Sequence, residues 1–280
     1  MDRRFDALIA GLVLSAQAAA ATFAPPLDVP MRAITEATRI DSGVTRRFTN
    51  ARGIVFRRAP QGYPVEVPME AGETESPADD PAAMFRAGFA RTAGRTVVLD
   101  IDNAGRVVAV ADQAAIWKAF LDGIAALAPP GASDLDRKRS GRIRAIVAAL
   151  APLPPDRQRA TLASLVEPLI AADLAREEER EEEAPPRMVR VPASSAFGAA
   201  QLDGLRTVKR TGTQLEVIVT AGGAIAIQAP DGPVQGRVTM ESTRRIDAAT
   251  GLVRESREHV LTRLPDGSIM SERTTNTRLK

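Results

Sequence analysis

The hydrophobic periodicity of this chain changes twice, and no other feature constrains the fold as much. Residues 31 to 111 hold alternating apolar runs separated by short Gly, Asp and Pro turns, as in "RTVVLDID", "NAG" and "RVVAVAD". Alternation with period two is typical of antiparallel hairpins. Residues 112 to 184 carry apolar side chains at helical spacing, and residues 188 to 280 return to period two. The order is therefore strands, helices, strands.

This order predicts an α+β fold. The two strand segments account for about 9 to 11 strands. We expect them to join in one large antiparallel curved sheet, half-barrel-like, with the central helical insertion packed on it. Residues 21 to 280 would then form a single domain. A division into two separate domains near residues 129 to 186 is the alternative.

The helical segment has clear local boundaries. The first helix covers residues 112 to 128 and ends at a Pro-Pro-Gly run, and Ser133 is placed to cap a second helix. Pro168 should kink or split the third helix. We expect the charge run from Arg176 to Glu183 to prolong that helix into solvent until Pro185 and Pro186 stop it. That charge run is most simply a solvated helix face, and an acidic docking surface is the alternative.

The first 20 residues, "MDRRFDALIAGLVLSAQAAA", have the layout of a secretory signal peptide. Two arginines precede an apolar stretch from Ala7 to Leu14, and small residues then offer a cleavage site near Ala18 to Ala20. A cytosolic amphipathic helix is disfavoured because no polar face interrupts the apolar run. We therefore expect a periplasmic or secreted protein. Its mature chain has no apolar run of the roughly 20 residues that a transmembrane helix needs.

Composition excludes several function classes. The chain has no cysteine and one histidine, His259, which excludes a disulfide scaffold, a thiolate nucleophile and a cysteine zinc site. With 37 basic and 35 acidic side chains the formal charge is +2, so no global field attracts nucleic acid. No nucleotide-binding glycine pattern or serine-hydrolase motif occurs. We expect no cofactor, no metal and no catalytic residues.

Three motifs have a chemical alternative beside a structural one. "DIDNAG" at residues 100 to 105 begins like a calcium loop, but positions five and twelve are alanine, so a hairpin turn is favoured. Ser256 and His259 lie three apart on a strand, which puts them on opposite faces and argues against a catalytic dyad. Glu66 and Glu70 could act as a glycosidase pair only if the fold set their separation.

Arginines recur in pairs along the predicted strands. They could bind anions such as lipid A phosphates or polysaccharide. Their alternation with Glu and Thr favours cross-strand ion pairs instead. The arginines concerned are Arg46, Arg47, Arg57, Arg58, Arg244 and Arg245.

The aromatic residues are few and concentrated around the first helix. Core packing between helix and sheet explains them most simply, and lining an acyl-binding cavity is the alternative. The candidate ligand-binding residues on this alternative are Phe85, Phe89, Trp117, Phe120, Leu121 and Ile124.

The exported start, the "GRVVAV" strand that leads into a helix and the closing "RRIDAATGLVRESREHVLTR" resemble families of uncharacterised bacterial secreted proteins. In those families long curved strands wrap helices, in a pattern similar to periplasmic lipoprotein-localisation carriers. The resemblance implies a half-barrel cradle for an apolar ligand and transfers no individual site residue. It favours a noncatalytic envelope protein that binds a hydrophobic ligand, a lipoprotein or another envelope protein. A carboxylate-based periplasmic hydrolase and a scaffold that binds proteins through exposed sheet edges are the alternatives.

Overall fold

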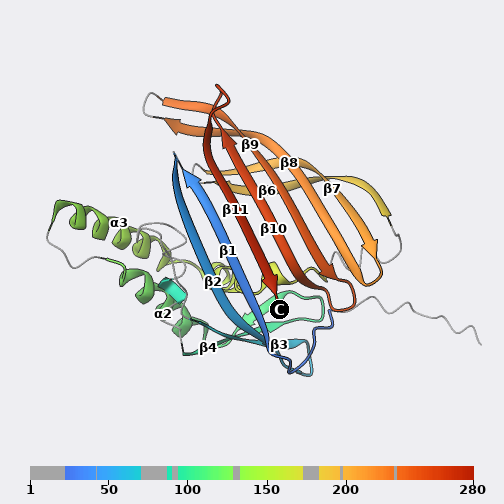
Figure 1. Ribbon diagram of the computed structural model, residues 1–280. Helices are drawn as coiled ribbons and strands as arrows, with labels where there is room; N and C mark the ends of the chain where they lie inside the picture. The colour runs from blue at the N-terminus through green and yellow to red at the C-terminus, as the bar shows by residue number, and fades with distance from the viewer. Residues whose placement is uncertain are drawn as a thin grey trace, which may run out of the picture.

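The computed structural model describes residues 23–41, 43–70, 87–89, 94–128, 133–172, 183–195, 198–229 and 232–280. Within these residues, eleven strands form one open antiparallel sheet (Figure 1). The strand order across the sheet is β5-β4-β3-β2-β1-β11-β10-β9-β8-β7-β6. Each strand pairs with its neighbour in sequence except at one place, where the first and last strands meet. The predicted antiparallel sheet is confirmed.

The strands fall into two groups along the chain. The first group precedes the helices and comprises β1 Met31–Asp41, β2 Val44–Phe56, β3 Tyr63–Pro68, β4 Thr96–Ile101 and β5 Val107–Val110. The second group follows them and comprises β6 Glu183–Ser195, β7 Gly198–Thr211, β8 Gln214–Ala229, β9 Gly232–Asp247, β10 Leu252–Arg263 and β11 Ile269–Leu279.

The two groups join through β1 and β11. Their antiparallel register runs from Ala33 opposite Leu279 to Asp41 opposite Ser271. A single sheet therefore contains both strand segments, with β5 and β6 at its two edges. Because side chains alternate between faces, this register decides which residues share a surface. We call the face that bears Ala33 and Leu279 the inner face.

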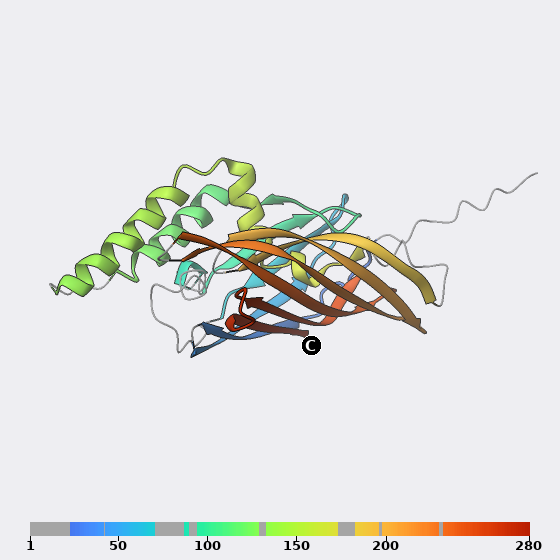
Figure 2. The same cartoon turned by 90° about the horizontal axis from the view of Figure 1, so that it is seen from above.

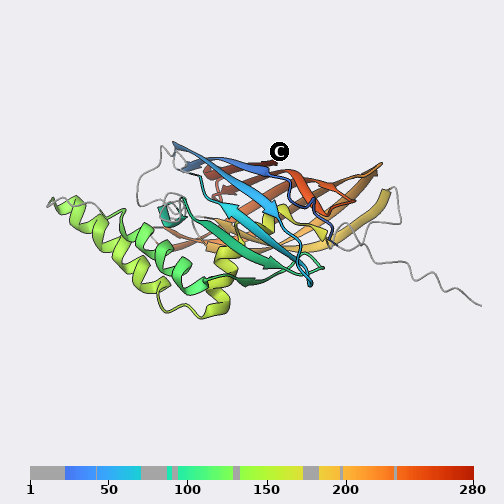
Figure 3. The same ribbon diagram turned by 90° about the horizontal axis from the view of Figure 1, so that it is seen from below.

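Between β5 and β6 the described residues form α2 Gln113–Ala125, α3 Asp134–Leu150, α4 Pro155–Ala163 and the short 3-10 helix η1 Glu167–Leu169. Residues 87–89, which precede β4, are also helical. Figures 2 and 3 show α2 and α3 beside the first strand group, with the twisted second group extending away from them. None of the helices in the described residues is long and apolar enough to span a membrane.

The residues predicted to cap or break helices have the expected effects. The hydroxyl of Ser133 accepts a hydrogen bond from the Asp136 backbone N–H at 3.1 Å, which caps α3. Pro168 lies in η1, separate from α4, so the third helix is split there.

The predicted extension of that helix is wrong at its end. Glu183 begins strand β6, and Pro185 and Pro186 lie within β6 beside a break in register between Ala184 and Arg187. An edge strand tolerates proline because one side of its backbone has no strand to bond. The rest of the charge run and the predicted signal peptide lie outside the described residues.

Within the described ranges, three apolar clusters stabilise the fold. The largest joins the first strand group to the helices and includes Ile54, Phe56, Leu99, Ile143 and Leu162. The other two lie at different levels of the inner face of the second group. One comprises Ala171, Val208, Leu215, Val217, Ile246 and Val253; the other comprises Leu202, Ile225, Ile227, Val238, Met240 and Val260. Polar and charged residues occupy the inner face between them.

Candidate binding groove on the inner face

A row of polar side chains crosses five strands of the inner face. It consists of Asn50 on β2, Thr35 on β1, Thr277 on β11, Ser256 on β10 and Arg244 on β9, each paired with the next in the ladder. The hydroxyl oxygens of Thr35 and Thr277 lie 3.1 Å apart, within hydrogen-bond distance. We call these five residues the polar row.

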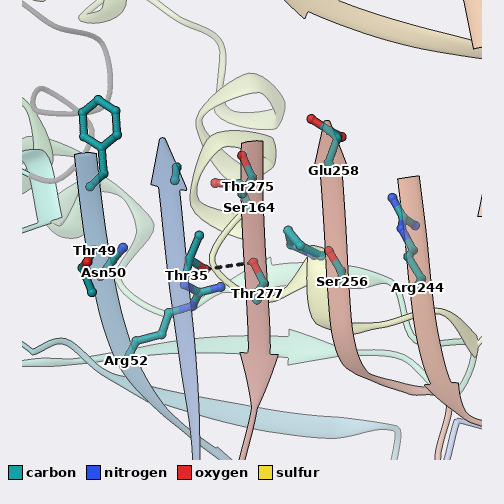
Figure 4. A pocket seen from close by; sticks show the side chains of 13 residues that line it. Thr35, Thr49, Asn50, Arg52, Ser164, Arg244, Ser256, Glu258, Thr275 and Thr277 are labelled. Carbon is teal, nitrogen blue, oxygen red and sulfur yellow. Dashed lines mark hydrogen bonds between the residues drawn. The ribbon is translucent and has the colours of Figure 1, made fainter. Parts of the chain in front are cut away.

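The polar row forms the floor of a groove between the sheet and the link from α4 to η1 (Figure 4). The groove has a volume of about 420 Å³, which is within the range of small-molecule sites. Side chains from both strand groups and from the helical segment line it. Besides the polar row they include Ala37, Phe48, Arg52, Ser164, Pro168, Glu258 and Thr275.

Arg52 is the most unusual residue of this groove. It is 5% exposed, and its Nε donates a hydrogen bond to the Leu165 carbonyl oxygen at 2.7 Å. In the described part of the chain no carboxylate pairs with it. Burial lowers the pKa of Arg52 to about 10, because the charged form loses water without gaining a counter-charge. Figure 4 shows Arg52 extending from β2 toward Thr35 and Thr277.

Arg244 ends the polar row on the other side. Its side chain is exposed and, within the described residues, forms no ion pair. The adjacent Arg245 points to the outer face and pairs with Glu216 at 3.4 Å and with Glu255 at 3.0 Å. The expected cross-strand ion pairs are thus confirmed for Arg245 and not found for Arg244.

Two of the other arginines named above, Arg46 and Arg57, also have carboxylate partners, whereas Arg47 and Arg58 form no ion pair within the described residues. Arg46 pairs with Asp41 at 2.9 Å, and Arg57 pairs with Asp28 and Glu66 at 2.8 Å each. These contacts agree with the ion-pair interpretation rather than with anion binding at those positions.

The carboxylates of the inner face near the groove are already engaged. Glu258 accepts a hydrogen bond from Arg273 at 2.7 Å. Asp41 pairs with both Arg39 at 2.6 Å and Arg46 at 2.9 Å. The three arginines in these pairs outnumber the two carboxylates, Asp41 and Glu258, so this part of the inner face carries excess positive charge.

A second space, lined by a group of valines, adjoins the first. Its volume is about 320 Å³, and Val189, Val191, Val217, Val219 and Met240 are among its apolar lining residues. Arg206, Ser242, Arg244 and Glu258 are its polar residues. Arg244 and Glu258 line both spaces, so the two lie side by side on the inner face. We name them together as one groove, with a polar section that contains the polar row and an apolar section that contains the valines.

The aromatic residues predicted to bind a ligand lie elsewhere. Phe89, Trp117, Phe120 and Ile124 are buried in the largest cluster, and Leu121 packs against it. The rings of Phe89 and Phe120 are 4.9 Å apart and those of Trp117 and Phe120 5.2 Å apart. None of these five lines either section of the groove. Phe85 lies outside the described residues, and a ligand-binding role for the set stays a prediction.

The calcium-like motif forms a hairpin turn. A side-chain oxygen of Asp102 accepts hydrogen bonds from the backbone N–H groups of Ala104 and Arg106 at 2.9 Å each. Gly105 adopts a φ of +82°, which favours glycine. Among the described residues, no group of three or more His, Asp or Glu side chains could hold a metal ion.

The residues considered above as catalytic acids or bases form ion pairs or lie on opposite faces of the sheet. His259 lies 3.0 Å from Glu272 on the outer face, whereas Ser256 belongs to the polar row inside. Glu70 pairs with Arg32 at 2.7 Å, and that hydrogen bond lowers the pKa of Glu70. A glycosidase general acid needs the opposite, a raised pKa.

Comparison with models of known protein families and with curated protein sequences finds no match. The groove is the feature of the molecule that bears on its function.

Proposed function

We propose that this chain is a noncatalytic exported protein that binds an amphipathic ligand, such as a lipid or a lipid-modified protein, in the groove on the inner face. One observation carries the proposal: a hydroxyl-rich section and a valine-rich section meet in a single groove at Arg244 and Glu258. A molecule with a polar end and an apolar chain matches that division. The sheet then acts as a half-barrel-like cradle and the helical insertion as its partial cover.

The alternatives fit the side chains less well. For a hydrolase, Glu66 and Glu70 would need to be available, but both are in ion pairs with arginines. For a scaffold, an edge strand should accept a strand from a partner. Edge strand β6 carries Pro185, Pro186 and Pro192, which remove backbone donors.

The test uses a neutral apolar dye, N-phenyl-1-naphthylamine, whose fluorescence rises in apolar sites. Val219→Glu places a carboxylate in the apolar section and should weaken dye binding by tenfold or more. The control is Ile218→Glu on the same strand, because Ile218 is 39% exposed on the outer face. It should bind the dye like the wild type.

Two results would contradict the proposal. One is a wild-type protein that binds neither the dye nor any lipid detectable by native mass spectrometry after purification from the periplasm. The other is equal dye binding by Val219→Glu and Ile218→Glu. Circular dichroism of both variants shows whether the fold is intact.

A further inference from the structure

We infer that the polar section of the groove is an oxyanion subsite that holds the phosphate headgroup of an amphiphile between Arg52 and Arg244. The inference rests on the proposed function and adds to it the chemical class of the ligand's polar end. Four observations support it: a buried cation without a counter-ion, a second cation facing the same space, hydroxyl donors between them, and an apolar section on the far side of Arg244.

The first observation is the charge on Arg52. A buried guanidinium is costly unless an anion or several hydrogen bonds compensate it. Within the described residues, Arg52 has one hydrogen bond, through Nε, and no carboxylate partner. Its remaining N–H groups lie at the wall of the polar section. A bound anion would supply the missing charge.

The second observation is the contrast between Arg244 and Arg245. Both lie on β9, and the cross-strand ladder provides carboxylates for Arg245 on the outer face. On the inner face the residues opposite Arg244 are Val217 and Ser256, neither of which can neutralise it. Arg244 is thus a cation that faces the groove with no ion pair in the described part of the chain.

The third observation is the set of donors between the two arginines. Neighbouring strands are about 4.8 Å apart, so the four steps from Asn50 to Arg244 cover roughly 19 Å along the polar row. Figure 4 shows Arg52 extending into this span from one end, with Arg244 at the other end. Thr35, Thr277 and Ser256 present hydroxyl groups in between. A phosphate has more acceptor oxygens than a carboxylate and can use more of these donors.

The fourth observation concerns the direction of the ligand. Arg244 lines both sections, whereas Arg52 lines the polar section alone. A headgroup beside Arg244 therefore places its chain over Val219, Met240 and Val191. Glu258, the carboxylate that lines both sections, is paired with Arg273 at 2.7 Å, which offsets its repulsion of the phosphate.

The test compares two ligands that share one acyl chain, a monoacylglycerol phosphate and the corresponding monoacylglycerol. Displacement of N-phenyl-1-naphthylamine gives the affinity of each for the full chain. The wild type should bind the phosphorylated ligand about tenfold or more tightly than the neutral one. A hydrogen bond to a charged group stabilises a complex enough to change its affinity by about that factor. Arg244→Met should reduce the preference to near one, because the phosphorylated ligand loses a charged partner that the neutral ligand does not have. Arg245→Met, the matched control on the outer face, should keep the preference.

Arg52→Met should also lose the preference. If it fails to fold because the contact with Leu165 is lost, Arg244→Met still decides, since Arg244 is exposed. A wild type that binds both ligands equally would overturn the phosphate subsite and leave the apolar groove intact. A wild type that binds neither would instead overturn the proposed function. Inorganic phosphate that binds as tightly as the phosphorylated amphiphile would also overturn the inference, because the site would then recognise the free ion.

Discussion

Truncation of Phe120 to alanine tests whether the aromatic residues around α2 form a packed core or a ligand cavity. Phe120 is 3% exposed, and its ring contacts Trp117 and Phe89 at centroid distances of 5.2 and 4.9 Å. The ring also lies directly on the backbone of Gly88, where an added Cβ would come within 2.4 Å of it. Backbone on one side and aromatic rings on the other leave little that can collapse into the void. We therefore expect a loss of about 3–5 kcal/mol in the free energy of unfolding.

The assay is urea denaturation followed by circular dichroism, with thermal unfolding as a second measurement. For a domain of this size a loss of that magnitude lowers Tm by about 6–20 °C. Leu135→Ala on α3 is the control, because Leu135 is 68% exposed and its truncation should change stability by less than about 0.5 kcal/mol. A loss below about 1 kcal/mol for Phe120→Ala, together with a shift in Trp117 fluorescence on addition of lipid, would refute the core assignment. The ligand would then bind at α2 rather than on the inner face.

Three further predictions concern a helix, a turn and export. Gly141→Ala in α3 should stabilise the protein by about 0.5–1 kcal/mol in urea denaturation, because the added Cβ meets no atom within 4 Å and alanine favours the helix. Burial acts to raise the pKa of Asp247, but hydrogen bonds from Arg254 and from the Ala249 backbone lower it overall. A lowered carboxyl pKa stabilises the fold at neutral pH, and that contribution disappears as pH falls below about 4. Asp247→Asn should therefore be less stable at pH 7 and lose less stability on acidification; parallel pH profiles would contradict this. Expressed from Met1 in a Gram-negative host, the protein should lose about 18 to 21 residues, and an intact mass that retains Met1 would contradict the signal peptide.

Features set by neighbouring residues could be predicted from the sequence. The hairpin at "DIDNAG" follows from an Asp that bonds nearby backbone N–H groups and a glycine at positive φ. The cap at Ser133 and the break at Pro168 follow from the same kind of local chemistry. The helix predicted through Glu183 is wrong at that residue, because Pro185 and Pro186 are compatible with an edge strand as well as with a helix end.

The groove could not be predicted, because it depends on pairing between distant segments. Thr35 and Thr277 are 242 residues apart in the chain and meet only through the register of β1 with β11. A shift of one residue in that register would turn every side chain of one strand to the other face. Nothing in either strand alone fixes the register. The polar row is therefore a property of the assembled sheet.

One local signal does point to the groove, and β2 carries it. Phe48, Ile54 and Phe56 share a parity that predicts a buried face, and Asn50 and Arg52 occupy the same parity between them. An arginine at a core position conflicts with the pattern around it, and such conflicts concentrate at functional sites because function outweighs stability there. In the folded chain Arg52 is buried with no carboxylate partner among the described residues, so the conflict persists. Removing its charge should therefore abolish the ability of the groove to hold an anion, and the stability that is lost with it should come from the hydrogen bond to Leu165.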